Sequence, residues 1–400
     1  MLPTRVAPTV AVVSTAFVAF FLLSSLLAQS AHAQSFQTLY AFSGSSDGGE
    51  PHAGVLRYAA GNLYGTAISN GAFGWGVVFM VDSAGIETVL HSFGNGDTDG
   101  RAPYGELVGD NAGNLYGTTY YGGGSGPCID GCGTVFKVDK FGIETVLHSF
   151  AGGSTDGCWP YGGLVRDSDG NLYGTTQECG ASNLGTVFKL DNSGTETILH
   201  NFAGGATDGA YPAYTTLLMD AQGTLFGVTE GGGTTSVGVV YQMTHTGTET
   251  VLYSFKGGTS DGCYVLGTPF MDKQGSIYGT ASQCGTSGVG TVWKLTKDGV
   301  ETVLHNFAAG TSDGENPSAG IVLDSAGNIY GTTTVGGAFG LGTVYRIGKK
   351  GKEIVLHSFD GADGQYPFGS LVQNPRTTVL IGTTQNGGTS GSGTVWEITK

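Results

Sequence analysis

The hydrophobic pattern of the chain is clearest over residues 160–211, where four short runs are separated by turns. The runs are LVRD (164–167), NLYGTT (171–176), GTVFKLD (185–191) and TETILHNF (195–202). Runs of this length, rich in β-branched and aromatic residues and bounded by Asp, Asn, Ser and Gly, are typical of β-strands. We therefore predict four strands here, with antiparallel neighbours wherever the connecting turn is tight.

This unit recurs seven times along the chain. Its most regular part reads GNLYGTT at 113–119 and 170–176, with looser copies at 61–67, 223–229, 275–281, 327–333 and 379–384. A phenylalanine closes the fourth run of each copy, and successive ones are separated by 51, 57, 52, 53, 52 and 52 residues: Phe42, Phe93, Phe150, Phe202, Phe255, Phe307 and Phe359. A fixed period of this length indicates a repeat architecture.

Four strands per repeat of about 50 residues, with a Gly and aromatic signature in each copy, predict a β-propeller blade. The fold class is therefore all-β, a seven-bladed propeller of four-stranded blades. The strand after the D-G-x-x-P loop is predicted to be the innermost strand of each blade, and T-V-L-H-S-F the outermost. The glycine of GNLYGTT is expected to let a surface of the next blade approach the strand closely. Residues 36–42 (FQTLYAF) form an outermost strand without a preceding blade, and we expect them to complete the last blade and close the ring.

The N-terminus and the composition bear on the location of the protein. An apolar run from Val10 to Leu27 precedes the small-x-small sequence Ala31-His32-Ala33, which predicts a signal peptide over residues 1–33, with an uncleaved anchor as the alternative. Residues 34–400 are then expected to be one secreted or extracytoplasmic domain, without stable membrane insertion after cleavage. A net charge of −15 argues against nucleic acid as a partner, because such binding requires clustered Lys and Arg.

The six cysteines occupy positions that the repeat makes comparable. Cys158 follows an Asp-Gly pair and lies 21 residues before Cys179, and Cys263 and Cys284 repeat both relationships. Equal positions in two repeats predict equal bonds, so we expect disulfides Cys158–Cys179 and Cys263–Cys284, which leaves Cys128 and Cys132 as a local pair. A zinc site is the alternative, but no histidine lies at ligand spacing from these cysteines.

The repeated sequence motif resembles that of a known protein family. D-x-x-G-N-L-Y-G-T-T, the Gly-Gly loop, G-T-V-F-K and V-L-H-S-F are similar to the tandem repeat of GloVer-containing secreted proteins, over essentially the whole of residues 34–400. The resemblance implies export and a propeller-like fold, and it supplies no catalytic residue. Many members carry a surface-anchoring signal after the repeats, and we expect none here.

Residues present in every repeat are expected to have a structural role in the blade. An aspartate precedes glycine in each loop between blades, where it can shape a turn or bind calcium, and we favour the turn: Asp47, Asp99, Asp156, Asp208, Asp261, Asp313 and Asp363. Histidine occupies one position in five outermost strands, and tyrosine replaces it in two: His91, His148, His200, His305 and His357, with Tyr40 and Tyr253. Separate blades should keep these rings too far apart to share a metal, so neither a metal site nor another cofactor is predicted.

Candidate catalytic residues are sought at positions where one repeat differs in sequence from the others. The innermost strands begin with small residues such as Gly54 and Gly163, whereas the second repeat has Glu106 there. Glycoside hydrolysis usually requires two carboxyl groups, for which Glu178 or Glu230 is the candidate partner. An enzyme is the less favoured interpretation.

Aromatic residues gather in the loops expected on one face. Those that we select as ligand-binding candidates are Tyr120, Tyr121, Trp159, Tyr161, Tyr211 and Tyr366, and others in the same loops are Tyr104, Tyr214, Tyr264 and Phe368. An aromatic face with a polar rim suits sugar rings or a protein partner, although the rings could also simply fill gaps between blades. The first hypothesis is therefore a secreted non-catalytic propeller that binds an extracellular glycan or surface protein. The alternatives are a carbohydrate-active hydrolase or lyase and a structural envelope protein.

Overall fold

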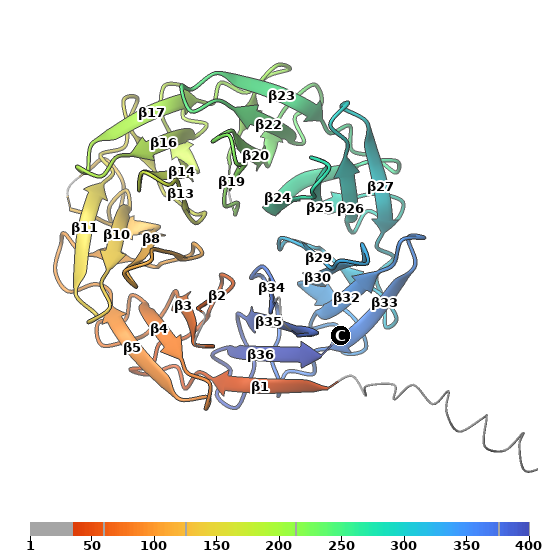
Figure 1. Cartoon of the computed structure of the whole chain (residues 1–400), viewed down its shortest axis with the longest axis horizontal. Helices are drawn as coiled ribbons and strands as arrows, with labels where there is room; N and C mark the ends of the chain where they lie inside the picture. Colours follow the sequence, from red (N-terminus) through yellow and green to blue (C-terminus); the bar gives the residue numbers. More distant parts are fainter. Residues whose placement is uncertain (1–34, 59–60, 125, 213, 375–376, 400) are drawn as a thin grey trace, which may run out of the picture. The chain divides into compact units, whose positions relative to one another are not determined.

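The computed structural model describes residues 35–58, 61–124, 126–212, 214–374 and 377–399. Residues Phe36–Lys400 form one compact unit, in which seven four-stranded antiparallel sheets surround a central axis (Figure 1). The predicted seven-bladed β-propeller is confirmed. The predicted signal peptide, residues 1–33, lies outside the described residues. In the part of the chain that the structure describes, no helix has the length and apolar character needed to cross a bilayer.

Each blade runs from a short inner strand to a longer outer strand. Blades 1 to 3 are β2 (Leu56–Arg57), β3 (Leu63–Ala67), β4 (Val77–Val81), β5 (Glu87–Ser92); β7 (Val108–Gly109), β8 (Leu115–Thr119), β10 (Thr134–Val138), β11 (Glu144–Ser149); and β13 (Val165–Arg166), β14 (Leu172–Thr176), β16 (Thr186–Leu190), β17 (Glu196–Asn201). Blades 4 and 5 are β19 (Leu218–Met219), β20 (Leu225–Thr229), β22 (Val239–Met243), β23 (Glu249–Ser254); and β24 (Gly262–Met271), β25 (Ile277–Cys284), β26 (Thr291–Leu295), β27 (Glu301–Asn306). Blades 6 and 7 are β29 (Val322–Leu323), β30 (Ile329–Thr333), β32 (Thr343–Ile347), β33 (Glu353–Ser358); and β34 (Val372–Gln373), β35 (Val379–Thr384), β36 (Thr394–Thr399), β1 (Phe36–Ala41).

The first strand of the described chain closes the ring. β1 pairs antiparallel with β36, from Phe36 opposite Ile398 to Ala41 opposite Thr394. It thereby supplies the outer strand of blade 7, as predicted, and it lies beside the C-terminal strand in Figure 1. Because β1 covers the edge of β36, the last repeat is a complete four-stranded blade and the edge of its third strand is not left open for pairing with another chain.

The GNLYGTT motif serves packing both within a blade and between blades. A Cβ added to Gly117 would lie 2.6 Å from Cζ of Phe136, the cross-strand neighbour on β10. The surface that requires the glycine therefore belongs to the same blade, and our expectation that the next blade supplies it is wrong. The contact with the next blade comes from Thr118, whose hydroxyl donates to the carbonyl oxygen of Gly162 at 2.8 Å.

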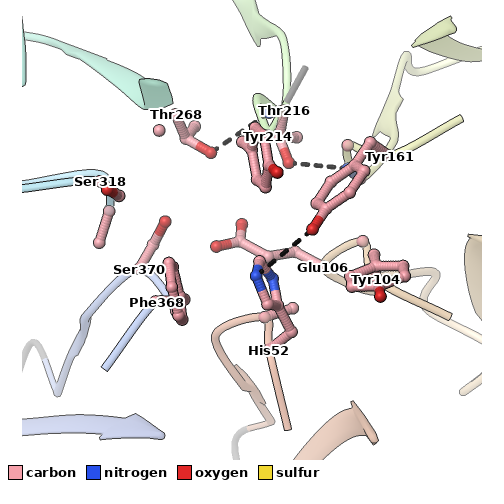
Figure 2. A pocket seen from close by; sticks show the side chains of 17 residues that line it. His52, Tyr104, Glu106, Tyr161, Tyr214, Thr216, Thr268, Ser318, Phe368 and Ser370 are labelled. Carbon is pink, nitrogen blue, oxygen red and sulfur yellow. Dashed lines mark hydrogen bonds between the residues drawn. The ribbon is translucent and has the colours of Figure 1, made fainter. Parts of the chain in front are cut away.

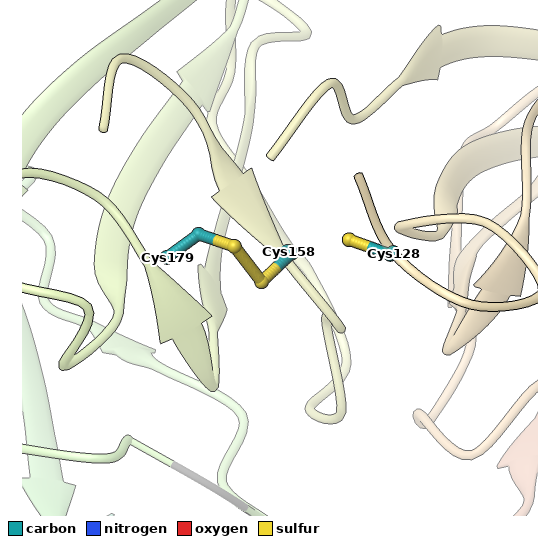
Figure 3. Close-up of side chains that lie close together, drawn as sticks. All are labelled: Cys128, Cys158 and Cys179. Atoms are coloured by element: carbon teal, nitrogen blue, oxygen red, sulfur yellow. A yellow bond between two sulfur atoms is a disulfide. The ribbon is translucent and has the colours of Figure 1, made fainter. Parts of the chain in front are cut away.

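All three predicted disulfides form: Cys158–Cys179, Cys263–Cys284 and Cys128–Cys132. The first two join the crossover loop, which links the outer strand of one blade to the inner strand of the next, to the loop between the second and third strands. In blade 3 these segments pair as β12 (Gly157–Cys158) and β15 (Glu178–Cys179). Figure 3 shows the sulfur of Cys128 directed toward the Cys158–Cys179 bond, so the loop between β8 and β10, which we call the extended blade 2 loop, packs on blade 3.

Three further ribbons join the same two loops: β6 (Gly100–Arg101) with β9 (Tyr121–Gly122), β18 (Gly209–Ala210) with β21 (Gly231–Gly232), and β28 (Gly314–Glu315) with β31 (Val335–Gly336). The crossover loops and the loops between second and third strands therefore share one face, which we call the long-loop face. The tight turns between first and second strands, and between third and fourth strands, lie on the opposite face.

Asp156 and His148 illustrate the structural roles expected of the repeated Asp and His residues. Asp156, for example, accepts the backbone N–H of Ala151 and of Gly157, each at 2.6 Å, which fixes the crossover turn. The His148 ring packs edge-on against Phe150 at 4.8 Å, and Tyr253 packs in the same way against Phe255. The rings thus share a packed position, with the polar tip directed at the aspartate.

Candidate functional site

The residue before the crossover proline has a left-handed backbone in every blade. Its φ lies between 54° and 59° in all seven copies, none of which is glycine: Glu50, Ala102, Trp159, Tyr211, Tyr264, Asn316 and Tyr366. In blade 5 the following residue is Val265 in place of proline. Side chains adopt this conformation at a cost, so the surrounding structure must impose it.

Backbone hydrogen bonds impose this conformation. The N–H of Trp159 donates to the carbonyl of Cys132 in the preceding blade at 2.8 Å, and its own carbonyl accepts the N–H of Gln177 at 3.1 Å. Tyr211 is held in the same way between Leu184 and Glu230. With both backbone groups engaged, the side chain is free to point outward, and Tyr211 and Tyr264 each retain 38% of their surface exposed.

Aromatic rings from blades 2 to 4 form a continuous cluster on the long-loop face. Tyr120 stacks on Trp159 at 5.9 Å between ring centroids and meets Tyr121 edge-on at 4.6 Å. Tyr161 packs against Tyr120 at 5.4 Å and against Tyr214 at 4.0 Å. The structure therefore brings together four of the six predicted ligand-binding residues, which with Tyr214 we call the aromatic cluster.

The other two candidates, Tyr211 and Tyr366, lie on the same face. Both occupy the pre-proline position, and neither makes a ring contact with the aromatic cluster among the described residues. They extend the aromatic surface around the rim without joining its centre.

The cluster continues to the axis of the propeller, where inner-strand residues surround a cavity of about 40 Å³ (Figure 2). The His52 ring lies parallel to Phe368 at 4.7 Å and meets Tyr104 edge-on at 5.1 Å. The hydroxyl of Tyr161 lies 3.5 Å from Nε2 of His52. Because a cavity of this size admits only water-sized molecules, a sugar ring cannot enter the axis, and a large ligand would contact the aromatic surface above it.

Burial gives His52 unusual electrostatics. The side chain is 9% exposed, and desolvation lowers its pKa to about 4, so the ring is neutral at pH 7. Burial also raises the pKa of Tyr161, and the neighbouring hydroxyls of Tyr214 and Tyr104 add to that shift. The His52 ring at the centre of the face is therefore uncharged at pH 7.

Glu106 lies at the axis, but other blades already hold its carboxylate. It accepts hydrogen bonds from the hydroxyl and backbone N–H of Ser370 in blade 7 and from the backbone of Gly54 in blade 1. Burial raises its pKa, and these hydrogen bonds oppose the increase. Glu106 thus ties blade 2 to the two blades that meet at the ring closure, an arrangement that accounts for a carboxyl side chain at the crowded axis.

The three predicted catalytic candidates are not assembled around the axis. Among the described residues that line the cavity, Glu106 is present, whereas Glu178 and Glu230 are absent. Glu178 lies in the ribbon strand β15, and Glu230 follows β20, beside Tyr211. The pair of carboxyl groups that glycoside hydrolysis requires therefore does not surround this cavity.

Sequence reasoning missed two parts of the site. His52 occupies the position that holds Tyr104, Tyr161 and Phe368 in other repeats, and aligning the residue after the proline would have found it. The pre-proline position varies from Glu to Ala, Asn and aromatics, so its shared left-handed backbone leaves no consistent residue signal.

Comparison with known proteins places the chain in a repeat family. The family described as the Gloeobacter/Verrucomicrobia repeat matches residues 28–236 and 213–400. The chain therefore belongs to this family, which confirms the resemblance found in its repeat motifs. No curated protein shows significant similarity to the sequence.

Solved structures share the fold at low sequence identity. The extracellular domains of two proteins assigned as hybrid two-component systems from B. thetaiotaomicron superpose with TM-scores of 0.54 and 0.56, at 12% and 9% identity, over 91% and 92% of this chain. The match covers 41% and 40% of those chains, so this chain spans about two fifths of their length. A gluconolactonase from Xanthomonas campestris matches at 13% identity over 72% of this chain and 82% of its own, with a TM-score of 0.42, too low to support an inference.

Proposed function

We propose that this protein is an extracytoplasmic, non-catalytic propeller that binds an extracellular glycan or a surface protein through its long-loop face. The observation that carries the proposal is the aromatic cluster of Tyr120, Tyr121, Trp159, Tyr161 and Tyr214. Aromatic faces stack on the apolar faces of sugar rings, and their polar tips hydrogen-bond to hydroxyl groups. The three disulfides support a location outside the cytoplasm, because such bonds persist in oxidising compartments.

The geometry favours surface binding over enclosure. The axial cavity is small, whereas Tyr211 and Tyr264 project from backbones fixed by hydrogen bonds to two neighbouring segments. Aromatic side chains on a rigid scaffold lose little conformational freedom when they bind, so each contact contributes more to affinity. An extended polysaccharide or a flat protein surface is the kind of partner that such a face accommodates.

The test is binding of the purified protein to an array of polysaccharides and bacterial surface glycans. We expect a specific glycan whose affinity falls at least tenfold in Trp159→Ala. The control is Phe141→Ala, which removes an aromatic ring, 78% exposed, from a tight turn on the opposite face. A blank array would exclude the glycan and direct the search to a protein partner through pull-down. An equal loss in both variants would contradict the assignment of the face.

The carbohydrate-active alternative can be tested on the same ligand. If Glu106 were a catalytic acid, Glu106→Gln would abolish cleavage of a bound glycan and leave binding intact. We expect no cleavage by the unchanged protein. We also expect Glu106→Ala to lower stability more than Glu106→Gln does, because glutamine still accepts a hydrogen bond from Ser370. The structural-envelope alternative predicts that no soluble ligand binds at all.

A further inference from the structure

A set of glutamates that was not considered in the sequence analysis lies near the repeated His and Asp residues at the blade boundaries. Six of the seven outer strands begin with glutamate: Glu87, Glu144, Glu196, Glu249, Glu301 and Glu353. At three successive boundaries the His of one blade, its crossover Asp and the Glu of the next blade offer ligand atoms within 4.8 Å of one another. The histidines do lie in separate blades, as expected, but at these three boundaries one histidine can share a site with two carboxylates.

At the third of these boundaries, hydrogen bonds already satisfy the aspartate. Asp208 accepts N–H groups from Ala203 and Gly209, each at 2.7 Å, one on each carboxylate oxygen. His200 Nε2 lies 3.1 Å from the same carboxylate, which is hydrogen-bonding distance. At the second boundary, Ala151 and Gly157 likewise occupy both oxygens of Asp156. Neither aspartate has an oxygen left without a partner.

The first boundary departs from this pattern. Both backbone donors to Asp99, Gly94 and Asn95, bind the same oxygen, Oδ2, at 2.9 and 2.8 Å. In the part of the chain that the structure describes, Asp99 Oδ1 and His91 Nε2 are both buried without a hydrogen-bond partner. The histidine nitrogen is in the same state at two other boundaries, and one oxygen of each of the six glutamates is too, so the unpartnered Asp99 Oδ1 is what distinguishes this boundary. Asp99 is 7% exposed, and its Oδ1 is the one crossover carboxylate oxygen among the described residues that is left in this state.

The spacing of these atoms suits a shared ion better than a hydrogen bond. His91 Nε2 lies 3.6 Å from Asp99 Oδ1, beyond the range of a hydrogen bond. Two ligands of a tetrahedral ion with bonds of about 2.1 Å lie roughly 3.4 Å apart. One cation would satisfy His91 Nε2 and Asp99 Oδ1, which otherwise lose their hydration without compensation, and it would neutralise the facing carboxylates of Asp99 and Glu144.

We propose that the boundary between blades 1 and 2 binds a divalent transition-metal ion, with Zn²⁺ the best match, through His91 Nε2, Asp99 Oδ1 and a carboxylate oxygen of Glu144. One nitrogen and two oxygen ligands from the protein leave a fourth position for water. All six cysteines are in disulfides, so no thiolate competes for the ion. The ion would link an outer strand, its crossover loop and the next blade.

The test is calorimetric titration of ZnCl₂ into tag-free protein that has been stripped of metal with a chelator. The key variant is His91→Tyr, because tyrosine occupies this position naturally in two blades, where Tyr40 and Tyr253 donate to their aspartates at 2.8 and 2.9 Å. We expect the unchanged protein to bind Zn²⁺ with micromolar or tighter affinity and His91→Tyr to lose one equivalent. The matched control, His357→Tyr, should keep that equivalent, because Phe36 replaces the glutamate at its boundary.

Thermal unfolding gives a second readout. Added Zn²⁺ should raise the Tm of the unchanged protein and of His357→Tyr, but not that of His91→Tyr. If His91→Tyr does not fold, Glu144→Gln changes a ligand on the other blade with little change in shape, and it should weaken Zn²⁺ binding at least tenfold. Absence of micromolar binding by the unchanged protein, or the same stoichiometry in every variant, would overturn the proposal.

Discussion

The ring of Phe36 lies parallel to that of His357, with 3.7 Å between the ring centroids and 6° between the ring planes. Phe36 begins the outer strand of blade 7 at the position where the other six blades have glutamate. It also packs against Phe359 and Trp396, each at 5.7 Å. The boundary next to the ring closure is therefore held by aromatic packing where other boundaries have a carboxylate.

This stacking predicts a specific loss of stability. Phe36→Ala removes the ring from the strand that closes the propeller, and we expect the free energy of unfolding to fall by about 2–3 kcal/mol. Denaturant-induced unfolding monitored by tryptophan fluorescence measures the change. Phe141→Ala, which removes an exposed ring, should change it by less than about 0.5 kcal/mol. Equal effects of the two substitutions would show that the stacking does not stabilise the closure.

Substitution of the glycine in GNLYGTT should also lower the free energy of unfolding. In Gly117→Ala the new methyl group would lie 2.6 Å from the Phe136 ring and 3.0 Å from Leu107, so the core must shift. We expect a loss of about 1–3 kcal/mol in the free energy of unfolding. Gly348→Ala is the matched control, since the nearest atoms there lie 3.9 Å away and φ is not left-handed. A tolerated Gly117→Ala would mean that the ring over the motif can move freely.

The disulfides should differ in their contributions to stability. Cys158 and Cys179 are separated by 21 residues, whereas Cys128 and Cys132 are separated by 4. The chain-entropy model then gives about 3 kcal/mol for the first bond and about 2 kcal/mol for the second. Paired Cys→Ala variants, compared by denaturant-induced unfolding, test the order. The reverse order would show that packing of the extended blade 2 loop outweighs chain entropy.

The fold could be predicted because seven copies report the same pattern. Strand order, ring closure by residues 36–42 and the disulfides all follow from aligning equivalent positions. The site could be predicted only in part, because it depends on contacts between distant blades. Glu106 and Ser370 are far apart in the sequence, and nothing in either repeat alone indicates that one accepts a hydrogen bond from the other. The partner of the motif glycine was misplaced for a related reason, since cross-strand register within the blade decides it.

Two glutamates outside the proposed metal site should make stability depend on pH. Burial, and then the charge of Asp47, raise the pKa of Glu87 to about 7. Burial and the charge of Asp261 raise the pKa of Glu301 to about 7, while Lys256 and Tyr253 oppose the shift. One oxygen of each carboxylate is buried without a hydrogen-bond partner among the described residues. Protonation relieves both the desolvation and the repulsion.

The sign of the effect follows from the direction of the shift. Because the pKa of Glu87 is higher in the folded state than its ordinary value of 4.5, folding favours the protonated form. Its stabilising contribution is fully present below about pH 4.5 and is lost as the pH rises through 7. Glu87→Gln and Glu301→Gln remove this dependence, so each should raise the Tm by roughly 1–3 °C at pH 8 and by little at pH 4.5. Thr88→Ser, a change in a non-titrating residue of the same strand, should keep the original pH dependence. A Gln variant whose Tm changes equally at both pH values would show that packing, rather than charge, sets its effect.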